Sequence, residues 1–410
     1  MTSHRPFGSA FKALYYGSLI SNTGDGIRLA ALPLLAASLT SSPFLISTVT
    51  AAQYLPWATF APIGGAIVDR RDRRQTILTT QLWRGLVMVV LAALVWTDLV
   101  AVWQLCVVAF LITAGEILVD PSIVATVSAV VDDDDLDRAN GRIASAEIVT
   151  NDFAGGPLGA ATFSLAPWLP FLLDAASYLG SLLPFRRLPP QRPRHDQPSD
   201  APTQRRTRRA EALEGFAWLR HHPTLGPFTA AQVVYYLGVS AGLSLLVVLV
   251  TIELGAPDYA FGLVLATGAA GAVAGSLAGG RIAKAIGVRA TLSGTVLIQG
   301  AALAALAIVR SPSLVGVLWF FSGFPAGVQR PVARAMQQRL TPNHLLGRVN
   351  VTARIFTRGI IIVGALTAGA LATATSVRSA LGVGGAVEIV AGILMWLVLG
   401  RALTTQSQTS

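Results

Sequence analysis

Residues 64–74 read G-G-A-I-V-D-R-R-D-R-R, and residues 279–289 repeat the pattern as G-G-R-I-A-K-A-I-G-V-R. Each copy ends an apolar run, where paired glycines let neighbouring helices approach closely. A second pair, L-D-R-A-N-G-R at 136–142 and L-G-R-V-N-V-T at 346–352, precedes a later apolar run in each half. Two pairs of matches at corresponding places predict a chain built from two halves of the same architecture.

The composition indicates a protein that lies almost entirely in a membrane. Of the 410 residues, 53% are hydrophobic and 13% are charged, whereas an ordinary soluble domain has roughly 25% charged residues. A helix needs about 20 mostly apolar residues to cross the hydrocarbon layer. We therefore predict an all-α membrane protein with twelve transmembrane helices. The apolar runs assigned as spans are 12–38, 43–68, 76–96, 101–129, 143–165, 168–185, 225–252, 259–282, 290–309, 313–335, 350–372 and 379–400.

The distribution of basic residues predicts the orientation of these spans. An even number of spans places both termini on one side, and loops rich in Lys and Arg stay in the cytoplasm. The loops on the side of the termini include the basic segments 70–74 and 186–220, whereas the opposite loops offer only Arg310 and Arg378. Both termini are therefore predicted to be cytoplasmic. The preference for Arg over Lys, with abundant Ala and Gly, favours a bacterial inner membrane.

A long polar stretch at residues 186–224 divides the chain into two sets of six spans. Its Pro-rich composition predicts a flexible cytoplasmic linker. The layout predicts two pseudo-symmetric six-helix bundles, at 1–185 and 225–402, and a disordered tail at 403–410. The basic run at 205–209 is followed by a helical pattern that we expect to lie along the anionic membrane surface. A loop that only fixes the topology is the alternative interpretation.

Asp69 lies at the cytoplasmic end of span two, among four arginines. An acid there can accept a hydrogen bond from a helix N-terminus, or from an Arg of the other half, in one transporter state and lose it in the other. Repetition of the pattern at 279–289 favours such a gate. A basic loop that only keeps the chain oriented is the alternative.

The G-x-x-x-D-R-x-x-R-R loop, the six-plus-six layout and the basic central linker resemble the major facilitator superfamily of transporters. The resemblance covers almost the whole chain. In that family the loop is the cytoplasmic gate motif. Here the resemblance assigns this role to Gly65, Asp69, Arg70, Arg73 and Arg74, and to Gly280, Lys284 and Arg289 in the second copy.

Finer features resemble one branch of the superfamily. The D-R-R-D-R-R form of the loop, S-N-T-G-D-G at 21–26 and R-A-N at 138–140 are similar to siderophore exporters and macrolide-efflux proteins. The family usually has Gly where this chain has Asp72, while the second copy keeps it as Gly287. Many members also carry an Arg in span four. This chain has none there, so its gate network must be built differently.

Span five contains the second informative motif, with Asn151 and Asp152 directly before it. A proline removes a backbone donor and glycines permit close packing, so this helix can kink and bring polar groups against the other half. A kink that serves only packing is the alternative. The motif resembles that of superfamily antiporters, which favours export. Its residues are Gly155, Gly156, Pro157 and Gly159.

Ionisable residues inside spans form the third group of candidates. A charge in hydrocarbon costs several kcal/mol and usually faces a partner or a water-filled cavity. A carboxylate there without a full partner can exchange protons near neutral pH. As proton-coupling residues we rank Asp25 first, then Asp152, then Glu116. A static pair with Arg28, three residues after Asp25, is the alternative for the first of these.

Glu116 shares span four with Asp120, and cationic partners are available elsewhere. They are Arg84 in span three and Arg354 and Arg358 near the start of span eleven. For the two acids of span four we expect a structural link to Arg354 or Arg358. Further acids within spans are Glu147, Asp174 and Glu388.

The superfamily resemblance places the substrate cavity among spans one, four, seven and ten. Large aromatic side chains with few fixed charges suit bulky amphiphilic ligands better than sugars, which need many hydrogen-bonding groups. Any single aromatic side chain can instead face lipid or the helical core. The cavity candidates are Asn22, Asp25, Gln232, Tyr235, Tyr236, Phe320, Phe324 and Gln329.

Several other functions lack sequence support. There is no phosphate-cradling glycine loop, metal-spaced His cluster or nucleophile constellation, so we predict no enzyme activity, no cofactor and no metal site. The aspartates at 132–135 lie beside Arg138 and Arg142 and are interpreted as a solvated acidic loop. Basic residues sit at helix ends, which argues against nucleic acid. Cys106 is the only cysteine, so no disulfide forms within the chain.

These observations together predict a secondary active transporter. We expect it to export small amphiphilic molecules, such as a drug, an antibiotic or a siderophore, by alternating access and in exchange for protons. We expect a monomer whose partners are its substrate, protons and the lipid bilayer. An importer or a lipid flippase on the same scaffold is the alternative. A membrane sensor or enzyme would need a signalling domain or a reactive constellation that the sequence lacks.

Overall fold

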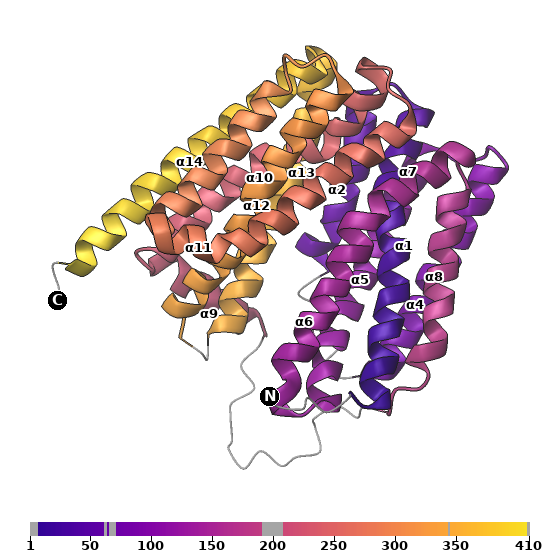
Figure 1. Cartoon of the computed structure of the whole chain (residues 1–410), viewed down its shortest axis with the longest axis horizontal. Helices are drawn as coiled ribbons and strands as arrows, with labels where there is room; N and C mark the ends of the chain where they lie inside the picture. The colour runs from indigo at the N-terminus through magenta and orange to yellow at the C-terminus, as the bar shows by residue number, and fades with distance from the viewer. Residues whose placement is uncertain (1–6, 61–63, 65–70, 191–207, 343–344, 408–410) are drawn as a thin grey trace. The chain divides into compact units, whose positions relative to one another are not determined.

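The computed structural model describes residues 7–60, 64, 71–190, 208–342 and 345–407, and their secondary structure is helical throughout (Figure 1). The helices of the first sequence half are α1 (Ser9–Leu39), α2 (Pro43–Thr59), α4 (Arg73–Trp96), α5 (Val102–Val130), η1 (Asp133–Asp135), α6 (Leu136–Glu147), η2 (Ile148–Ala154), α7 (Gly155–Leu165) and α8 (Leu169–Phe185). Those of the second half are α9 (Arg208–His221), α10 (Leu225–Val247), η4 (Val248–Glu253), α11 (Asp258–Ala305), α12 (Pro312–Leu340), α13 (Leu346–Ala374) and α14 (Val377–Ser407).

The twelve predicted spans coincide with helical stretches wherever their residues are described. Spans eight and nine lie together in α11, which breaks at Gly287, and span five runs through α6, η2 and α7. By length and apolar composition alone, six of the described helices qualify as membrane spans: α4, α5, α10 with η4, α11, α13 and α14. α8 is apolar but has only 17 residues. α1 carries the charged residues Asp25 and Arg28 in its middle, which lower its hydropathy.

The two copies of the repeated loop build their turns differently. Gly287 has φ 82° and ψ 158°, a backbone conformation that residues with a Cβ essentially cannot adopt. At the corresponding place Asp72 has φ −59°, and its carboxylate accepts a hydrogen bond from the backbone N–H of Gln75 at 2.9 Å. Asp72 is therefore the N-cap of α4. The aspartate that stands at this position in place of the family's glycine therefore has a structural role as a helix cap.

The chain separates into two compact units. The first unit comprises Met1–Leu39 and Thr59–Asp200, and within it α1 packs against α5, α7 and α8. The contact with α7 is very close, because a Cβ on Gly155 or Gly159 would collide with the backbone of Gly26 or Ile27. This is the close helix packing that the glycines of span five predict.

The distortion predicted for span five lies directly before its proline. Ile148–Ala154 forms the π-helical turn η2, and Pro157 follows in the first turn of α7. Proline has no backbone donor and its ring crowds the carbonyl four residues earlier. A π-turn at this point accommodates both effects without ending the helix.

The second unit comprises Thr40–Ala58 and Ala201–Ser410. Its core includes Phe228 and Tyr235 of α10, Leu292 of α11 and Met395 of α14. Helix α2 belongs to this unit by its contacts, although it lies in the first half of the sequence. The backbone N–H of Phe44 donates to Thr373 Oγ1 of α13 at 3.2 Å.

The helical pattern within the central linker forms α9, which packs on α13. Arg348, which belongs to the repeated segment 346–352, donates to Glu214 of α9 at 2.8 Å. The rings of Phe216 and Phe356 lie 5.6 Å apart in the same contact. The C-terminal part of the linker is thus attached to the second unit.

Candidate functional site

Five ionisable side chains meet inside the first unit, and we call them the buried ionic cluster. They are Asp25 and Arg28 of α1, Arg84 of α4, Glu116 of α5 and Asp174 of α8. Four of them are buried, and the side chain of Glu116 is 27% exposed. Charges buried this deeply persist only when other charges and hydrogen bonds compensate them.

Arg84 lies at the centre of the cluster. Its Nη2 donates to Asp25 Oδ1 at 2.8 Å and to the Tyr178 hydroxyl at 2.8 Å, and it lies 3.3 Å from Glu116 Oε1. Its guanidinium group also lies 4.2 Å from the centre of the Tyr178 ring. The Tyr178 hydroxyl in turn donates to Asp25 Oδ1 at 2.5 Å. Arg84 and Tyr178 therefore fix the Asp25 carboxylate together.

Arg28 connects the three carboxylates. Its Nη2 donates to Asp25 Oδ1 at 2.9 Å and to Glu116 Oε1 at 2.8 Å. Its Nε lies 3.4 Å from Asp174 Oδ2, which is close enough for an ion pair but too poorly placed for a hydrogen bond. Asp25 thus has three donors, whereas Asp174 has one long ion pair.

A layer of polar side chains positions the arginines. Gln81 Oε1 accepts from Arg84 Nη1 at 3.1 Å, while Gln81 Nε2 donates to Ser21 Oγ at 2.7 Å and to Ser181 Oγ at 3.2 Å. Gly115 of α5 leaves the space that the Arg84 side chain occupies, because a Cβ there would overlap it. α1, α4, α5 and α8 therefore position the cluster jointly.

The charges of the cluster do not balance when every group is ionised. Three carboxylates face two guanidinium groups, which leaves one negative charge in a buried site. An uncompensated buried charge costs several kcal/mol, and uptake of a proton removes that cost. Asp174 has the weakest hydrogen bonding of the three acids. Among the described residues its Oδ2 accepts no hydrogen bond, and Ser177 Oγ reaches its Oδ1 only at 3.5 Å.

The ranked proton-coupling residues occupy different settings. Asp25 forms an ion pair with Arg28, as its alternative interpretation expects. Arg84 and Tyr178 also bind the Asp25 carboxylate. Asp152 lies in η2, and its side chain is outside the described part of the structure.

In span four, Glu116 pairs with Arg28 and Arg84, and Asp120 is exposed. The expected link from these acids to Arg354 or Arg358 would join the two units, and it stays a prediction. In the second unit the guanidinium group of Arg354 lies 5.7 Å from the Trp57 ring, and that of Arg358 lies 5.6 Å from the Tyr54 ring. Cation–π contacts thus connect α13 to α2.

Part of the gate motif can be placed, while Gly65, Asp69 and Arg70 lie outside the described residues. Arg73 Nη1 donates to the carbonyl of Ala125 at 3.2 Å, and Arg74 Nη2 donates to the carbonyl of Arg186 at 2.7 Å. Both bonds tie the start of α4 to neighbouring helices, and the carbonyl of Arg186 lies at the C-terminal end of α8, where a cation is favourable.

The second copy of the motif makes a matching contact. Arg289 occupies the place that Arg74 has in the first copy, and its Nε donates to the carbonyl of Trp396 in α14 at 2.9 Å. Its guanidinium group also lies 4.0 Å from the Trp396 ring. In both halves, therefore, the last Arg of the motif binds a carbonyl at the last helix of its half. Gly280 and Lys284 line a pocket in the second unit.

The cavity candidates lie on three helices, α1, α10 and α12. Tyr235 is buried and donates to Gln299 Oε1 at 2.8 Å, so its hydroxyl is used within the core of the second unit. Tyr236 is only partly buried, and its ring centre lies 4.9 Å from that of Tyr235. Phe320 and Phe324 stack with centres 6.5 Å apart. The other candidates are Asn22 and Gln232, both partly exposed, and Gln329, which is buried.

Three residues of the site were not singled out from the sequence. Asp174 was recognised only as one acid among several, and Tyr178 and Gln81 not at all. A usable signal existed in α8 and α4, because Asp174 and Tyr178 are four residues apart and Gln81 and Arg84 are three apart. Each pair therefore lies on one helix face. Four polar residues on two apolar helices are enough to indicate a shared site.

Comparisons with known proteins agree with this architecture. A family model described as "Transmembrane secretion effector" (MFS_3) matches residues 1–410. The uncharacterized MFS-type transporter YceJ of Bacillus subtilis strain 168 is 26% identical over 313 residues, which are 76% of each chain.

Solved transporter structures share the fold. The nucleoside transporter NupG has a TM-score of 0.74 at 12% identity, over 95% of this chain and 99% of that one. A bacterial homologue of the iron transporter ferroportin has a TM-score of 0.72 at 16% identity, over 95% of this chain and 98% of that one. The protein is therefore a polytopic membrane transporter, and it belongs to the major facilitator superfamily, within the family of transmembrane secretion effectors.

Proposed function

We propose that this protein exports small amphiphilic molecules from the cytoplasm by alternating access and takes up protons in exchange. The observation that carries the proposal is the buried ionic cluster, which has one carboxylate more than guanidinium groups. A carrier that uses a proton gradient needs a buried acid that can be neutral in one state and ionised in another. The description of the matching family, a secretion effector, supports the outward direction.

Within the cluster, we propose that Asp174, and not Asp25, carries the proton. Asp25 has three donors in place, so neutralising it would leave those donors unsatisfied. Asp174 is fully buried, and its contacts among the described residues are two long ones, to Arg28 Nε at 3.4 Å and to Ser177 Oγ at 3.5 Å. A proton on Asp174 therefore neutralises the cluster at the lowest cost in hydrogen bonds.

Arg28 provides the connection between proton binding and movement of helices. When Asp174 loses its proton, its carboxylate attracts Arg28 more strongly and competes with Asp25 and Glu116 for this guanidinium group. Such a change alters the contact between α1 and α8, which pack directly against each other. Alternating access requires that the two protonation states favour different helix arrangements.

The substrate class follows from the aromatic side chains of α10 and α12. Tyr236, Phe320 and Phe324 are partly exposed within the second unit, and large aromatic surfaces favour bulky amphiphilic ligands. We propose that Asp69 and its arginines close the cytoplasmic side, as the family motif implies. The protein would act as a monomer in a bacterial inner membrane, as a carrier without enzyme activity.

Proton movement in inverted membrane vesicles tests this function. The vesicles are acidified inside and supplied with lipophilic cations, macrolides or siderophores, and release of protons from the lumen is followed with a pH-sensitive dye. We expect release with the wild type and none with Asp174→Asn. The control is Asp134→Asn, which removes an exposed acid outside the cluster and should keep the wild-type response.

Three other results would contradict parts of the proposal. Loss of the response in Asp25→Asn but not in Asp174→Asn would move the proton to the acid that the sequence ranks first. Substrate movement out of the inverted vesicles would make the protein an importer. Absence of proton release with every compound class would overturn the proposed antiport.

A further inference from the structure

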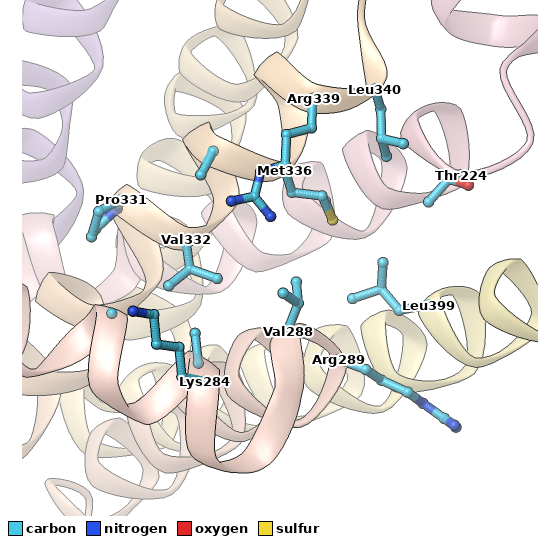
Figure 2. Close-up of a pocket in the computed structure, with 13 residues that line it drawn as sticks. Thr224, Lys284, Val288, Arg289, Pro331, Val332, Met336, Arg339, Leu340 and Leu399 are labelled. Carbon is cyan, nitrogen blue, oxygen red and sulfur yellow. The ribbon is translucent and has the colours of Figure 1, made fainter.

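A second feature of the molecule plays no part in the proposed proton cycle. A cavity of about 540 Å³ lies within the second unit, between the start of α10, the region of α11 around Gly287, the end of α12 and α14 (Figure 2). Its volume is within the range of about 300–1,000 Å³ that small-molecule sites occupy. Its walls include Lys284, Val288, Val332, Met336, Arg339 and Leu399.

The charged side chains that line this pocket are all basic. Lys284 extends from α11 and Arg339 from α12, so the two cations come from opposite walls (Figure 2). Among the described residues no Asp or Glu lines the pocket, and neither cation forms an ion pair with a described carboxylate. Arg289 also borders the pocket, but its side chain points away and is bound to Trp396. Lys284 and Arg339 thus remain available for an anion.

The remaining walls are apolar. Val288, Val332, Met336 and Leu399 present aliphatic and thioether groups, and Val332 is buried. A pocket with cations from two walls and apolar side chains between them complements a molecule that has an anionic head and a hydrocarbon chain. An inorganic anion would leave the apolar surface uncovered, and a neutral hydrocarbon would leave the cations unused.

We propose that this pocket binds one anionic phospholipid, with the phosphate between Lys284 and Arg339 and the start of an acyl chain against the apolar walls. The distribution of basic loops predicts that this end of the second unit lies at the cytoplasmic surface. Anionic lipids are abundant in that leaflet, and each nearby basic residue contributes about 1 kcal/mol of attraction to them. The lipid is therefore available where the spans emerge from the hydrocarbon layer.

The proposal also accounts for a difference between the two repeats. Counting from the paired glycines, Lys284 occupies in the second copy the place that Asp69 has in the first. A lysine at this place cannot act as the acid of a gate, but its positive charge suits the phosphate of a lipid headgroup. The two halves would thus use the same loop for different partners.

Native mass spectrometry of the full-length protein in neutral detergent tests the proposal. The protein is titrated with dioleoyl phosphatidylglycerol and, separately, with dioleoyl phosphatidylcholine. We expect one phosphatidylglycerol molecule to bind preferentially. In the double variant Lys284→Gln/Arg339→Gln, its affinity should fall roughly 30-fold, from two lost contributions of about 1 kcal/mol each.

Matched variants separate the pocket from the charge of the surrounding surface. Arg281 and Arg334 are exposed cations on the same two helices, and they do not line the pocket. Arg281→Gln/Arg334→Gln should keep the wild-type affinity. Ala335→Trp fills an exposed part of the pocket wall without removing a charge, and it should weaken phosphatidylglycerol binding at an unchanged unfolding temperature.

The proposal is wrong if phosphatidylcholine binds as tightly as phosphatidylglycerol, or if the two double variants lose affinity equally. It is also wrong if Ala335→Trp binds the lipid like the wild type. None of these outcomes depends on transport, so the lipid site and the proposed antiport can fail independently.

Discussion

Asp25 and Asp174 lie in the same cluster, yet their surroundings give them different properties. Three side chains donate to Asp25, while the Asp174 carboxylate depends on Arg28 Nε at 3.4 Å. Spacing in the sequence shows that Asp25 can pair with Arg28, because the two are three residues apart on one helix. It contains no information on Arg84 or Tyr178, which reach Asp25 from α4 and α8. Asp25, which ranks first by its depth in span one, is therefore the acid of the cluster with the most hydrogen bonds.

Removal of Arg84 should destabilise the first unit strongly. Arg84→Ala leaves Asp25 and Glu116 with Arg28 as their only described cation, and loss of one partner from a buried ion pair costs about 3–5 kcal/mol. Arg84→Lys should recover part of this loss, because a lysine restores the charge but not the forked geometry that reaches Gln81 and Tyr178 together. The measurement is the thermal unfolding midpoint of the purified protein in detergent.

Arg187→Ala is the control for this prediction. Arg187 is exposed at the end of α8 and lies outside the cluster, so its removal should change the midpoint little. Equal effects of Arg84→Ala and Arg187→Ala would show that the ionic contacts of Arg84 contribute nothing net to stability.

Among the helices, α11 and α4 show how two related sequences reach the same turn by different routes. Asp72 caps α4 with its side chain, whereas Gly287 turns the chain with a left-handed φ. The sequence was sufficient to predict a turn at both places and to recognise Asp72 as unusual.

Replacement of Gly287 by alanine should destabilise the second unit by about 1–3 kcal/mol, because a Cβ is strained in this backbone conformation. Gly280 has a helical backbone and open space around its Cα, so Gly280→Ala should be neutral or slightly stabilising. Thermal unfolding of the two variants in parallel gives the comparison. The assignment of strain fails if Gly287→Ala is as stable as Gly280→Ala.

The start of α10 is capped by a histidine, and this cap should depend on pH. His222 Nδ1 accepts hydrogen bonds from the backbone N–H groups of Leu225 at 3.0 Å and Thr224 at 3.2 Å. Partial burial lowers the pKa of His222 below its ordinary value of 6.5. A lowered pKa means that the folded state favours the neutral ring. The cap is therefore complete above pH 6.5 and is lost as the pH falls through the pKa of the folded state.

Hydrogen exchange measures this cap directly. Protection of the first amides of α10 should decrease when the pH is lowered from about 7 to about 5, after correction for intrinsic exchange rates. In His222→Asn an amide oxygen can replace the ring nitrogen without titrating, so protection should no longer depend on pH. An unchanged pH dependence in this variant would assign the effect to another group.

At the scale of the whole molecule, composition and repetition were sufficient for the architecture. The apolar runs and the two copies of the loop predicted twelve spans in two related halves, because both features are local in sequence. The cluster could not be predicted in the same way. Tyr178 and Asp25 are 153 residues apart, and only packing of helices brings them together. For the same reason the sequence did not indicate that α2 joins the second unit.

The predicted orientation of the whole chain can be tested with single cysteines. Cys106 is the only native cysteine, so Cys106→Ser gives a cysteine-free background. Thr97, directly after α4, and Asp133, in η1, are exposed and flank α5 on its two sides in the sequence. With a maleimide that does not cross membranes, Thr97→Cys should be labelled in intact cells and Asp133→Cys only after lysis. The reverse pattern would place both termini outside.

The imbalance of the buried ionic cluster also has an electrical meaning. Without a bound proton its three carboxylates and two guanidinium groups carry one net negative charge, and with one proton they carry none. Moving one elementary charge through a membrane voltage of about 100 mV changes the free energy by about 2.3 kcal/mol. With an uncharged substrate only the unprotonated carrier is charged, so a cell interior that is negative favours its outward movement. For such a substrate the membrane potential alone would therefore sustain export in the proposed cycle after the pH difference has vanished.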